Sequence, residues 1–140
     1  LDKNSARAVW VPNRNGLFIN IAACFCDSYN YDSIIFGGNK EEAETFSDNS
    51  NDFCLCANEF LKYSTSVHPK VFSPLINLEK HEIIDFAIKL NVNFKLLKSC
   101  YNSTKNNISH CGKCESCKRL KTAILKSGHK DIINLLFSDY

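Results

Sequence analysis

The sequence predicts an α/β protein built around a parallel sheet. Segments with strand and helix patterns alternate along the chain, which is the order found in parallel α/β proteins. The central strand pattern, SIIFGG, is a continuous apolar run, typical of a strand that helices cover on both faces. The 140 residues are 44% hydrophobic, so the chain has enough apolar residues to bury a core.

The first two strands flank the first helix. RAVWV is the first predicted strand, and Pro12 ends it because proline cannot donate to a sheet ladder. A loop from Pro12 to Asn15 follows, and Asn15 is expected to cap the helix. One helical face carries an apolar stripe that we expect in the core: Phe18, Ile21, Ala22 and Phe25. SIIFGG is the second strand, and the segment NKEEAETFSDNSND after it is predicted to be a polar loop.

The remaining elements continue the alternation. A helix that begins near Phe53 buries one face, formed by Phe53, Cys56, Ala57, Phe60 and Leu61. KVFSPLI is the third strand, in which Pro74 argues for an end or edge position. The next helix, Glu79–Leu90, is expected to have Asn77 as its cap and an apolar side of Ile83, Ala87 and Leu90. After Gly128, a short amphipathic helix is expected to pack on the core or on a partner.

Net charge and hydropathy exclude two classes of partner. The formal net charge is +2 with acidic and basic residues interspersed, so no basic tract favours direct nucleic-acid binding. No stretch approaches the roughly 18 apolar residues of a membrane-spanning helix, and the first ten residues hold no apolar signal region. We expect a soluble cytoplasmic protein. Methionine is absent, which is expected of a processed or partial chain rather than a complete translation product.

The eight cysteines fall into two groups. Cys24, Cys26, Cys54 and Cys56 lie in apolar runs and are expected to pack in the core. The other four lie among polar residues with the spacing C-x10-C-x2-C-x2-C: Cys100, Cys111, Cys114 and Cys117. Four thiolates at this spacing can close a tetrahedron around one structural zinc ion. An iron–sulfur cluster is the alternative, although the x3-C-P continuation of the bacterial ferredoxin pattern is absent.

Polar neighbours surround the second group of cysteines. Lys113, Lys118 and Arg119 either offset the charge of four thiolates or form solvated surface. His110 directly precedes Cys111, which makes simultaneous ligation awkward, so we treat it as a neighbour of the site. A closed four-thiolate site leaves no position for water or substrate, which predicts a structural role for the metal.

Four stretches of the chain resemble, in order, motifs of the QueC family, the 7-cyano-7-deazaguanine synthases of queuosine biosynthesis. They are VPNRNGLFINIAA, IIFGGNKEEAETFSDNSNDF, SPLINLEKHEII and SCYNS…HCGKCESCKR, within a resemblance that runs from Val9 to Arg119. The resemblance implies a PP-loop ATP pyrophosphatase fold, a parallel Rossmann-like sheet of the adenine nucleotide alpha hydrolase type with a C-terminal helical zinc-binding segment. Residues 1–95 would then belong to the PP-loop domain, and residues 96–140 to the zinc-binding segment and C-terminal helices.

The resemblance also implies an activity. Family members are carbon–nitrogen ligases that convert 7-carboxy-7-deazaguanine, ammonia and ATP into 7-cyano-7-deazaguanine, and they are expected to be homodimers. Their four-cysteine zinc site matches Cys100, Cys111, Cys114 and Cys117. The ATP-binding signature S-G-G-x-D-S is absent from these 140 residues, and FGGNK lacks its serines and acidic residue. We therefore expect a C-terminal portion of the enzyme that is inactive alone.

The loops that follow the predicted strands supply candidate site residues. Arg14 and Asn13 offer a cation and an amide for phosphate and carboxylate groups, and we predict a catalytic role for both. The carboxylate of Asp48 or Asp52 can accept the N1 and 2-amino protons of a deazaguanine, and Asn39 can offer amide contacts. The simpler alternatives are a surface arginine and helix-capping aspartates.

Two other functions remain open at this point. Another PP-loop enzyme, such as one transferring sulfur to tRNA, would need a catalytic thiol outside the zinc site. A zinc-ribbon interaction module without catalysis would need a basic or aromatic exposed face.

Overall fold

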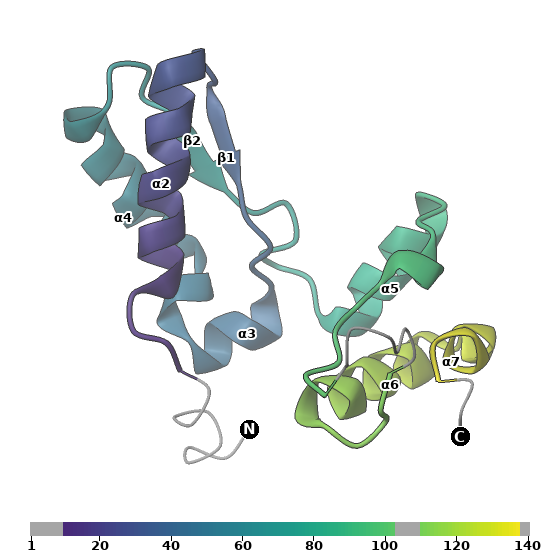
Figure 1. Ribbon diagram of the computed structural model, residues 1–140. Coiled ribbons are helices and arrows are strands. Elements are labelled where there is room, and N and C mark those ends of the chain that lie inside the picture. Colours follow the sequence, from purple (N-terminus) through teal and green to yellow (C-terminus); the bar gives the residue numbers. More distant parts are fainter. Residues whose placement is uncertain (1–9, 103–109, 138–140) are drawn as a thin grey trace. The chain divides into compact units, whose positions relative to one another are not determined.

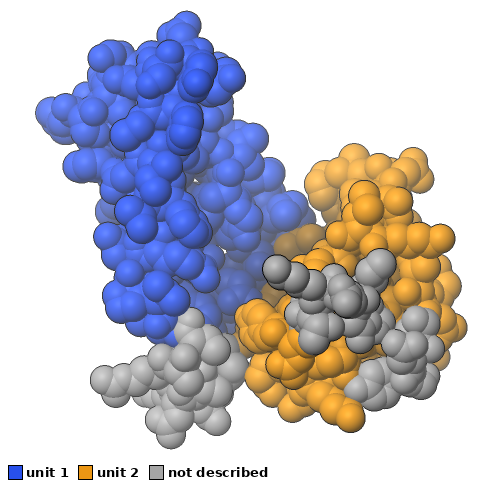
Figure 2. Space-filling model, in the orientation of Figure 1, with its two compact units in different colours: residues 1–78 blue, residues 79–140 orange. Residues whose placement is uncertain are grey.

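The computed structural model describes residues 10–102 and 110–137. The described chain is mostly helical, with one small parallel sheet, and forms two compact units, residues 1–78 and 79–140 (Figures 1 and 2). The predicted division into functional segments at residues 95 and 96 stays a prediction. None of the helices in the described ranges has the length and apolarity to cross a membrane.

The described part of unit 1 contains the sheet and four helical segments. In chain order its elements are α2 (Arg14–Tyr29), β1 (Ser33–Ile35), α3 (Lys40–Thr45), the 3-10 turn η1 (Ser47–Asn49), α4 (Asn51–Ser64) and β2 (Lys70–Phe72). The two strands pair in parallel with Ile34 opposite Val71, and both of these side chains are buried. The parallel pairing and two of the three predicted strands are confirmed. Of the predicted strand RAVWV, residues 7–9 lie outside the described residues, and Trp10 and Val11 belong to no strand.

A side chain closes one edge of the sheet. Asn58 of α4 donates from Nδ2 to the Val71 carbonyl (3.0 Å), and the Val71 backbone N–H donates to Asn58 Oδ1 (2.6 Å). The amide therefore takes the place of a further strand beside β2. Pro74 lies just beyond the end of this strand, in agreement with the predicted end or edge position. Ile35 of β1 is 65% exposed, although the sequence predicted a strand covered on both faces.

Helix α2 buries a different face from the one predicted. Its buried residues are Ile19, Ala23 and Cys26, which pack with Leu61 of α4 and with the strands. The predicted stripe is wrong for Phe18, Ile21 and Phe25, which are 60%, 48% and 56% exposed. Apolar residues occur almost all round this helix, so periodicity could not choose between two apolar faces.

The helix starts also differ from the prediction. Asn13, in a left-handed conformation, is the N-cap residue of α2, and Asn15 lies within the helix. The predicted polar loop instead forms α3 and η1, because Asn39 Oδ1 accepts the Glu42 N–H (3.1 Å) and acidic residues fill the first turn of α3. Ser50 caps α4.

The apolar cysteines of unit 1 do not all reach the core. Cys26 and Cys54 are buried as predicted. Cys24 and Cys56 are exposed, and so is Phe60, so the core prediction is wrong for these three residues. On α4 the buried positions are Cys54 and Leu61, which shifts the packed face away from the predicted one.

Unit 2 is helical. It comprises α5 (Lys80–Lys89), the 3-10 turn η2 (Phe94–Leu96), α6 (Glu115–Ser127) and α7 (Lys130–Leu136). Glu79 caps α5 through a capping box with Glu82, so the predicted Asn77 cap is wrong. On α5 the buried side chain is Ile84, and Leu90 is exposed.

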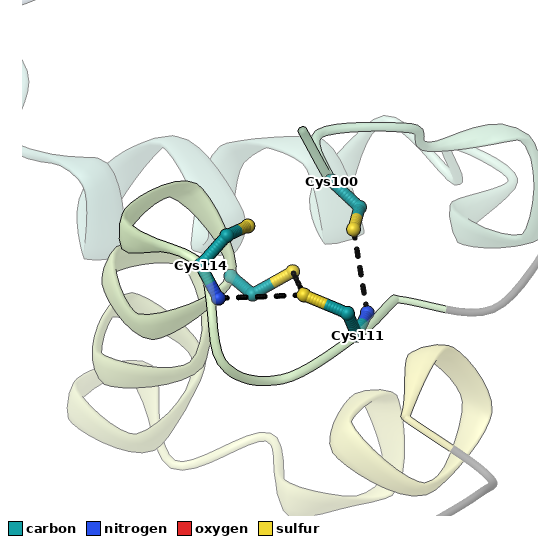
Figure 3. A group of neighbouring side chains, drawn as sticks. Cys100, Cys111 and Cys114 are labelled. Atoms are coloured by element: carbon teal, nitrogen blue, oxygen red, sulfur yellow. Dashed lines mark hydrogen bonds between the residues drawn. The ribbon is translucent and has the colours of Figure 1, made fainter. Parts of the chain in front are cut away.

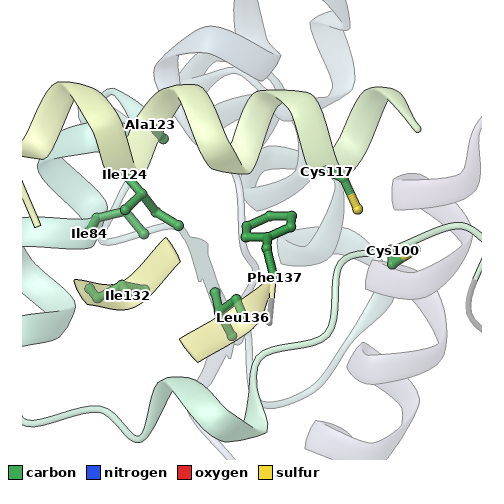
Figure 4. Packing of buried hydrophobic residues seen from close by; sticks show 8 residues of the cluster. All are labelled: Ile84, Cys100, Cys117, Ala123, Ile124, Ile132, Leu136 and Phe137. Carbon is green, nitrogen blue, oxygen red and sulfur yellow. The ribbon is translucent and has the colours of Figure 1, made fainter. Parts of the chain in front are cut away.

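The core of unit 2 joins α5, α6 and α7 to the segment that contains Cys100. Its buried members are Ile84, Cys100, Cys117, Ala123, Ile124, Ile132, Leu136 and Phe137 (Figure 4). The predicted C-terminal helix is α7, and it packs on this core. Cys100 and Cys117, two of the four cysteines of the predicted metal site, are thus buried in this core.

Candidate functional site

Local turns bring the four polar-region cysteines together. Cys100 follows η2, while Cys111 and Cys114 flank a turn in which Gly112 has a φ of 65°, a left-handed conformation that glycine adopts at low cost. Cys114 is the N-cap residue of α6, so Cys117 lies in the first turn of that helix. The two-residue gaps therefore place three thiols around one helix start.

The sulfur geometry fits a metal ion. The Sγ atoms of Cys100, Cys111, Cys114 and Cys117 all lie within 4.8 Å of one another. In a tetrahedral zinc–thiolate site with Zn–S bonds of about 2.3 Å, neighbouring sulfurs lie about 3.8 Å apart. The Sγ atoms of Cys111 and Cys117 are already 3.9 Å apart. These four cysteines are thus placed to bind a metal ion, and a set of four soft donors suits zinc.

Backbone N–H groups point at two of the sulfurs (Figure 3). Cys111 N–H donates to Cys100 Sγ (3.4 Å), and Cys114 N–H donates to Cys111 Sγ (3.3 Å). The Cys114 and Lys113 N–H groups lower the pKa of Cys111 from 9.0 to about 6, because they stabilise its thiolate. Burial raises the pKa of Cys117 to about 12. Lys118 pairs with Glu115 (2.9 Å) on the exposed face of α6.

His110 lies beside the cysteine cluster and outside its ligand set. It is 1% exposed, and its Nε2 accepts the Ser99 backbone N–H (3.2 Å). Its ring centroid lies 5.3 Å from that of Phe137. Burial lowers the pKa of His110, so the neutral ring is favoured. The sequence identified this residue only as a neighbour, because a hydrogen bond across eleven positions has no local signature.

A second polar group lies at the start of α2 in unit 1. We call Asn13, Arg14, Asn15 and Asp48 the polar corner. Asn15 Nδ2 donates to the Asp48 carbonyl (3.0 Å), and Arg14 donates from Nε and Nη2 to Asn15 Oδ1 (3.3 Å each). The Asp48 side chain is buried and accepts from Asn49 Nδ2 (3.0 Å). Asn15 thus joins residues 33 positions apart, a role that the sequence did not indicate.

The other predicted site residues lie elsewhere in unit 1. Asn39 caps α3, and Asp52 is exposed in the first turn of α4, where Ser50 is the cap. Asn13 lies directly over Gly16, where a Cβ would collide with its side-chain oxygen. Glycine at position 16 therefore allows the tight approach of Asn13 to α2.

Comparisons with known proteins agree on one family. The family model described as "Queuosine biosynthesis protein QueC" matches residues 1–128. A 7-cyano-7-deazaguanine synthase of Carboxydothermus hydrogenoformans is 51% identical over 121 residues, which are 86% of this chain and 55% of that protein. The synthase of Methanosarcina mazei is 43% identical, covering 91% of this chain and 54% of that protein. The synthase of Pyrococcus abyssi is 39% identical, covering 92% and 56% respectively. The chain thus spans about half the length of the curated relatives it matches.

Proposed function

The chain belongs to the QueC family, and from this premise we propose that it forms part of a 7-cyano-7-deazaguanine synthase. The proposed reaction is the ATP-dependent conversion of 7-carboxy-7-deazaguanine and ammonia into 7-cyano-7-deazaguanine, by a cytoplasmic homodimer. The observation that carries this proposal is the 39–51% identity to synthases over most of the chain.

The proposed fold is the PP-loop α/β domain. In a parallel ladder, alternate residues of a strand turn their backbone groups toward each neighbour. Lys70 N–H donates to the Asp32 carbonyl (2.8 Å), and Phe36 N–H donates to the Phe72 carbonyl (3.2 Å). The backbone groups of Ile35 therefore face away from β2. A larger parallel sheet would extend on the β1 side, because Asn58 already occupies the backbone groups of Val71 on the β2 side.

The polar corner is the proposed catalytic region. Conversion of a carboxylate to a nitrile needs an oxygen activated as a leaving group, and stabilising that charge calls for cationic and amide donors. Arg14 and Asn13 supply such donors at an exposed helix start. We assign substrate contacts to Asn39, Asp48 and Asp52 as in the sequence prediction. The Asp48 carboxylate has one oxygen engaged with Asn49.

Product formation tests this function directly. The chain is incubated with 7-carboxy-7-deazaguanine, ammonia and ATP, alone and together with a separately expressed segment that carries an S-G-G-x-D-S loop. Nitrile product, followed by mass spectrometry, is expected only in the mixture, because these 140 residues lack a glycine-rich turn of that sequence to cradle pyrophosphate. Product from the chain alone, or from neither sample, would contradict the proposal.

Arg14 offers a finer test in the active mixture. Arg14→Ala is expected to lower turnover at least about tenfold, the equivalent of about 1.4 kcal/mol, because a cation facing the reacting groups is lost. Lys62→Ala is the matched control, since Lys62 is an exposed cation that pairs with Glu59 on α4. Equal activity of the two variants would assign Arg14 to the solvated surface.

The proposed cofactor is one structural zinc ion held by the four clustered cysteines. Elemental analysis of the purified chain should give one zinc per chain, whereas iron with labile sulfide would contradict the assignment. Structural zinc in small sites contributes on the order of 10 kcal/mol. Cys114→Ser should therefore remove the metal and leave the residues from Cys100 onward open to proteases. Cys24→Ser, an exposed cysteine in unit 1, is the control and should keep both metal and resistance.

A further inference from the structure

The segments that carry Cys100 and Cys111 are held together by two reciprocal hydrogen bonds. The Cys111 backbone N–H donates to the Cys100 side chain (3.4 Å). One residue earlier on each segment, the Ser99 backbone N–H donates to Nε2 of the His110 side chain (3.2 Å). Each segment thus donates a backbone N–H to a side chain of the other segment. One of these acceptors is a proposed metal ligand, and the other is His110.

The His110 ring is enclosed by its surroundings. The side chain is 1% exposed, its own backbone N–H donates to the Leu136 carbonyl (3.2 Å), and its ring packs on Phe137. A ring nitrogen that accepts a hydrogen bond carries no proton, so a neutral ring must carry its proton on Nδ1. Nδ1 is buried and has no hydrogen-bond partner among the residues that the structure describes.

A buried polar ring costs free energy unless a specific contact offsets it. The hydrogen bond that Nε2 accepts from the Ser99 N–H is such a contact. Without this acceptor the Ser99 N–H would lose its hydrogen bond. Groups outside the ligand set that orient ligands in this way typically change metal affinity strongly when they are removed.

We propose that His110 is a positioning residue of the metal centre. Its Nε2, by accepting the Ser99 N–H, fixes the separation of Cys100 from Cys111 before the metal binds. His110 is not a ligand in this proposal, and the inference rests on the proposed four-cysteine metal site.

Glutamine and asparagine, two amides of different length, separate this role of His110 from packing. The side-chain oxygen of glutamine reaches about as far from Cβ as Nε2 does, whereas that of asparagine reaches only as far as Nδ1. His110→Gln should therefore keep zinc affinity within about threefold of the parent chain, and His110→Asn should lose about 10- to 100-fold. His110→Phe retains an aromatic ring against Phe137 without an acceptor, so it should resemble His110→Asn. His129→Gln, at a histidine 41% exposed in the same unit, is the matched control and should leave affinity unchanged.

The affinity is measured on the 140-residue chain by competition with a chromogenic chelator, and the sulfur geometry by the absorption of the cobalt(II)-loaded chain. If His110→Phe binds zinc as the parent does while His110→Gln is impaired, the ring acts by packing and the proposal is overturned. A parent chain that binds no metal would instead overturn the metal proposal itself.

The ring tautomer gives a readout that does not depend on metal affinity. Two-bond nitrogen–proton correlation spectra of the labelled chain should show the His110 proton on Nδ1. A proton on Nε2 would overturn the inference, since that nitrogen could not then accept from Ser99. This result is obtained in the folded chain whether or not any variant folds.

Discussion

Two thiols of the candidate metal centre, Cys111 and Cys117, have pKa values shifted in opposite directions, although the four sulfurs lie within 4.8 Å of one another. Cys111 accepts a backbone N–H in a solvent-accessible turn, whereas Cys117 is fully buried in the first turn of α6. A thiolate is stabilised by donors and destabilised by desolvation, so the two environments shift the two pKa values in opposite directions. In the metal-free site, Cys111 should therefore lose its proton at a lower pH than Cys117 does.

This order predicts the reactivity of the metal-free chain. At pH 7, iodoacetamide should modify Cys111 before Cys117, because the pKa of Cys111 is lowered to about 6 and that of Cys117 is raised to about 12. Peptide mass spectrometry at increasing times measures the order. Cys54, whose pKa is raised by burial in unit 1, is an internal control for slow modification. Simultaneous modification of Cys111 and Cys117 would contradict the prediction.

The same shifts give the stability of the metal-free chain a pH dependence. Cys111 has a folded pKa below its ordinary value of 9.0, so its contribution is complete above pH 9 and is lost as the pH falls through about 6. Cys117 acts in the opposite sense, since its raised pKa favours folding below pH 9 and this contribution is lost toward about pH 12. Together these two thiols place their stability maximum near pH 9.

At the scale of elements, the side-chain amide of Asn58 supports one edge of the sheet. Asn58→Ala removes both hydrogen bonds to Val71 and leaves a backbone N–H and a carbonyl unpaired at a partly buried strand. We expect it to lower the free energy of unfolding by about 2 kcal/mol, measured by urea denaturation. Glu59→Ala, the neighbouring exposed position, loses only a surface ion pair with Lys62 and should cost less than about 1 kcal/mol. Equal effects of the two substitutions would contradict the assigned role of Asn58.

Local patterns in the sequence predicted some elements better than others. The two-residue gaps between Cys111, Cys114 and Cys117 act within one helix start, so their convergence could be predicted from spacing. The side of α2 that is buried could not, because its apolar residues surround the helix and tertiary contacts select Ile19 over Phe18.

Long-range side-chain contacts lie beyond what spacing can predict. Asn15 appeared to be a helix cap, yet its amide reaches Asp48, and Asn58 gave no sign of pairing with a strand. The role of His110 likewise depends on Ser99, which approaches it only in the folded chain. In each case one side-chain amide or imidazole replaces a backbone partner, and such a contact has no periodicity.

At the scale of the whole molecule, two separate hydrophobic cores predict two responses to metal removal. Cys100 and Cys117 belong to the core of unit 2, while the core of unit 1 is formed by α2, α4 and the strands. If the proposed zinc ion is removed with a chelator, amide hydrogen exchange should accelerate in α6 and α7 and stay unchanged in α4. The reason is that only the core of unit 2 loses the metal–thiolate bonds that hold it together. Exchange is measured by mass spectrometry of peptides. Uniform acceleration across the chain would contradict this independence.

The Asn58 contact also bears on the self-association of this protein through its strand edges at high concentration. An exposed strand edge is a template on which another chain can pair, and such pairing leads to aggregation. At β2 the backbone groups of Val71 are already occupied by the Asn58 side chain. Edge-to-edge association through β2 would first have to break these bonds. The Asn58 amide therefore disfavours fibre-like growth on that side of the sheet.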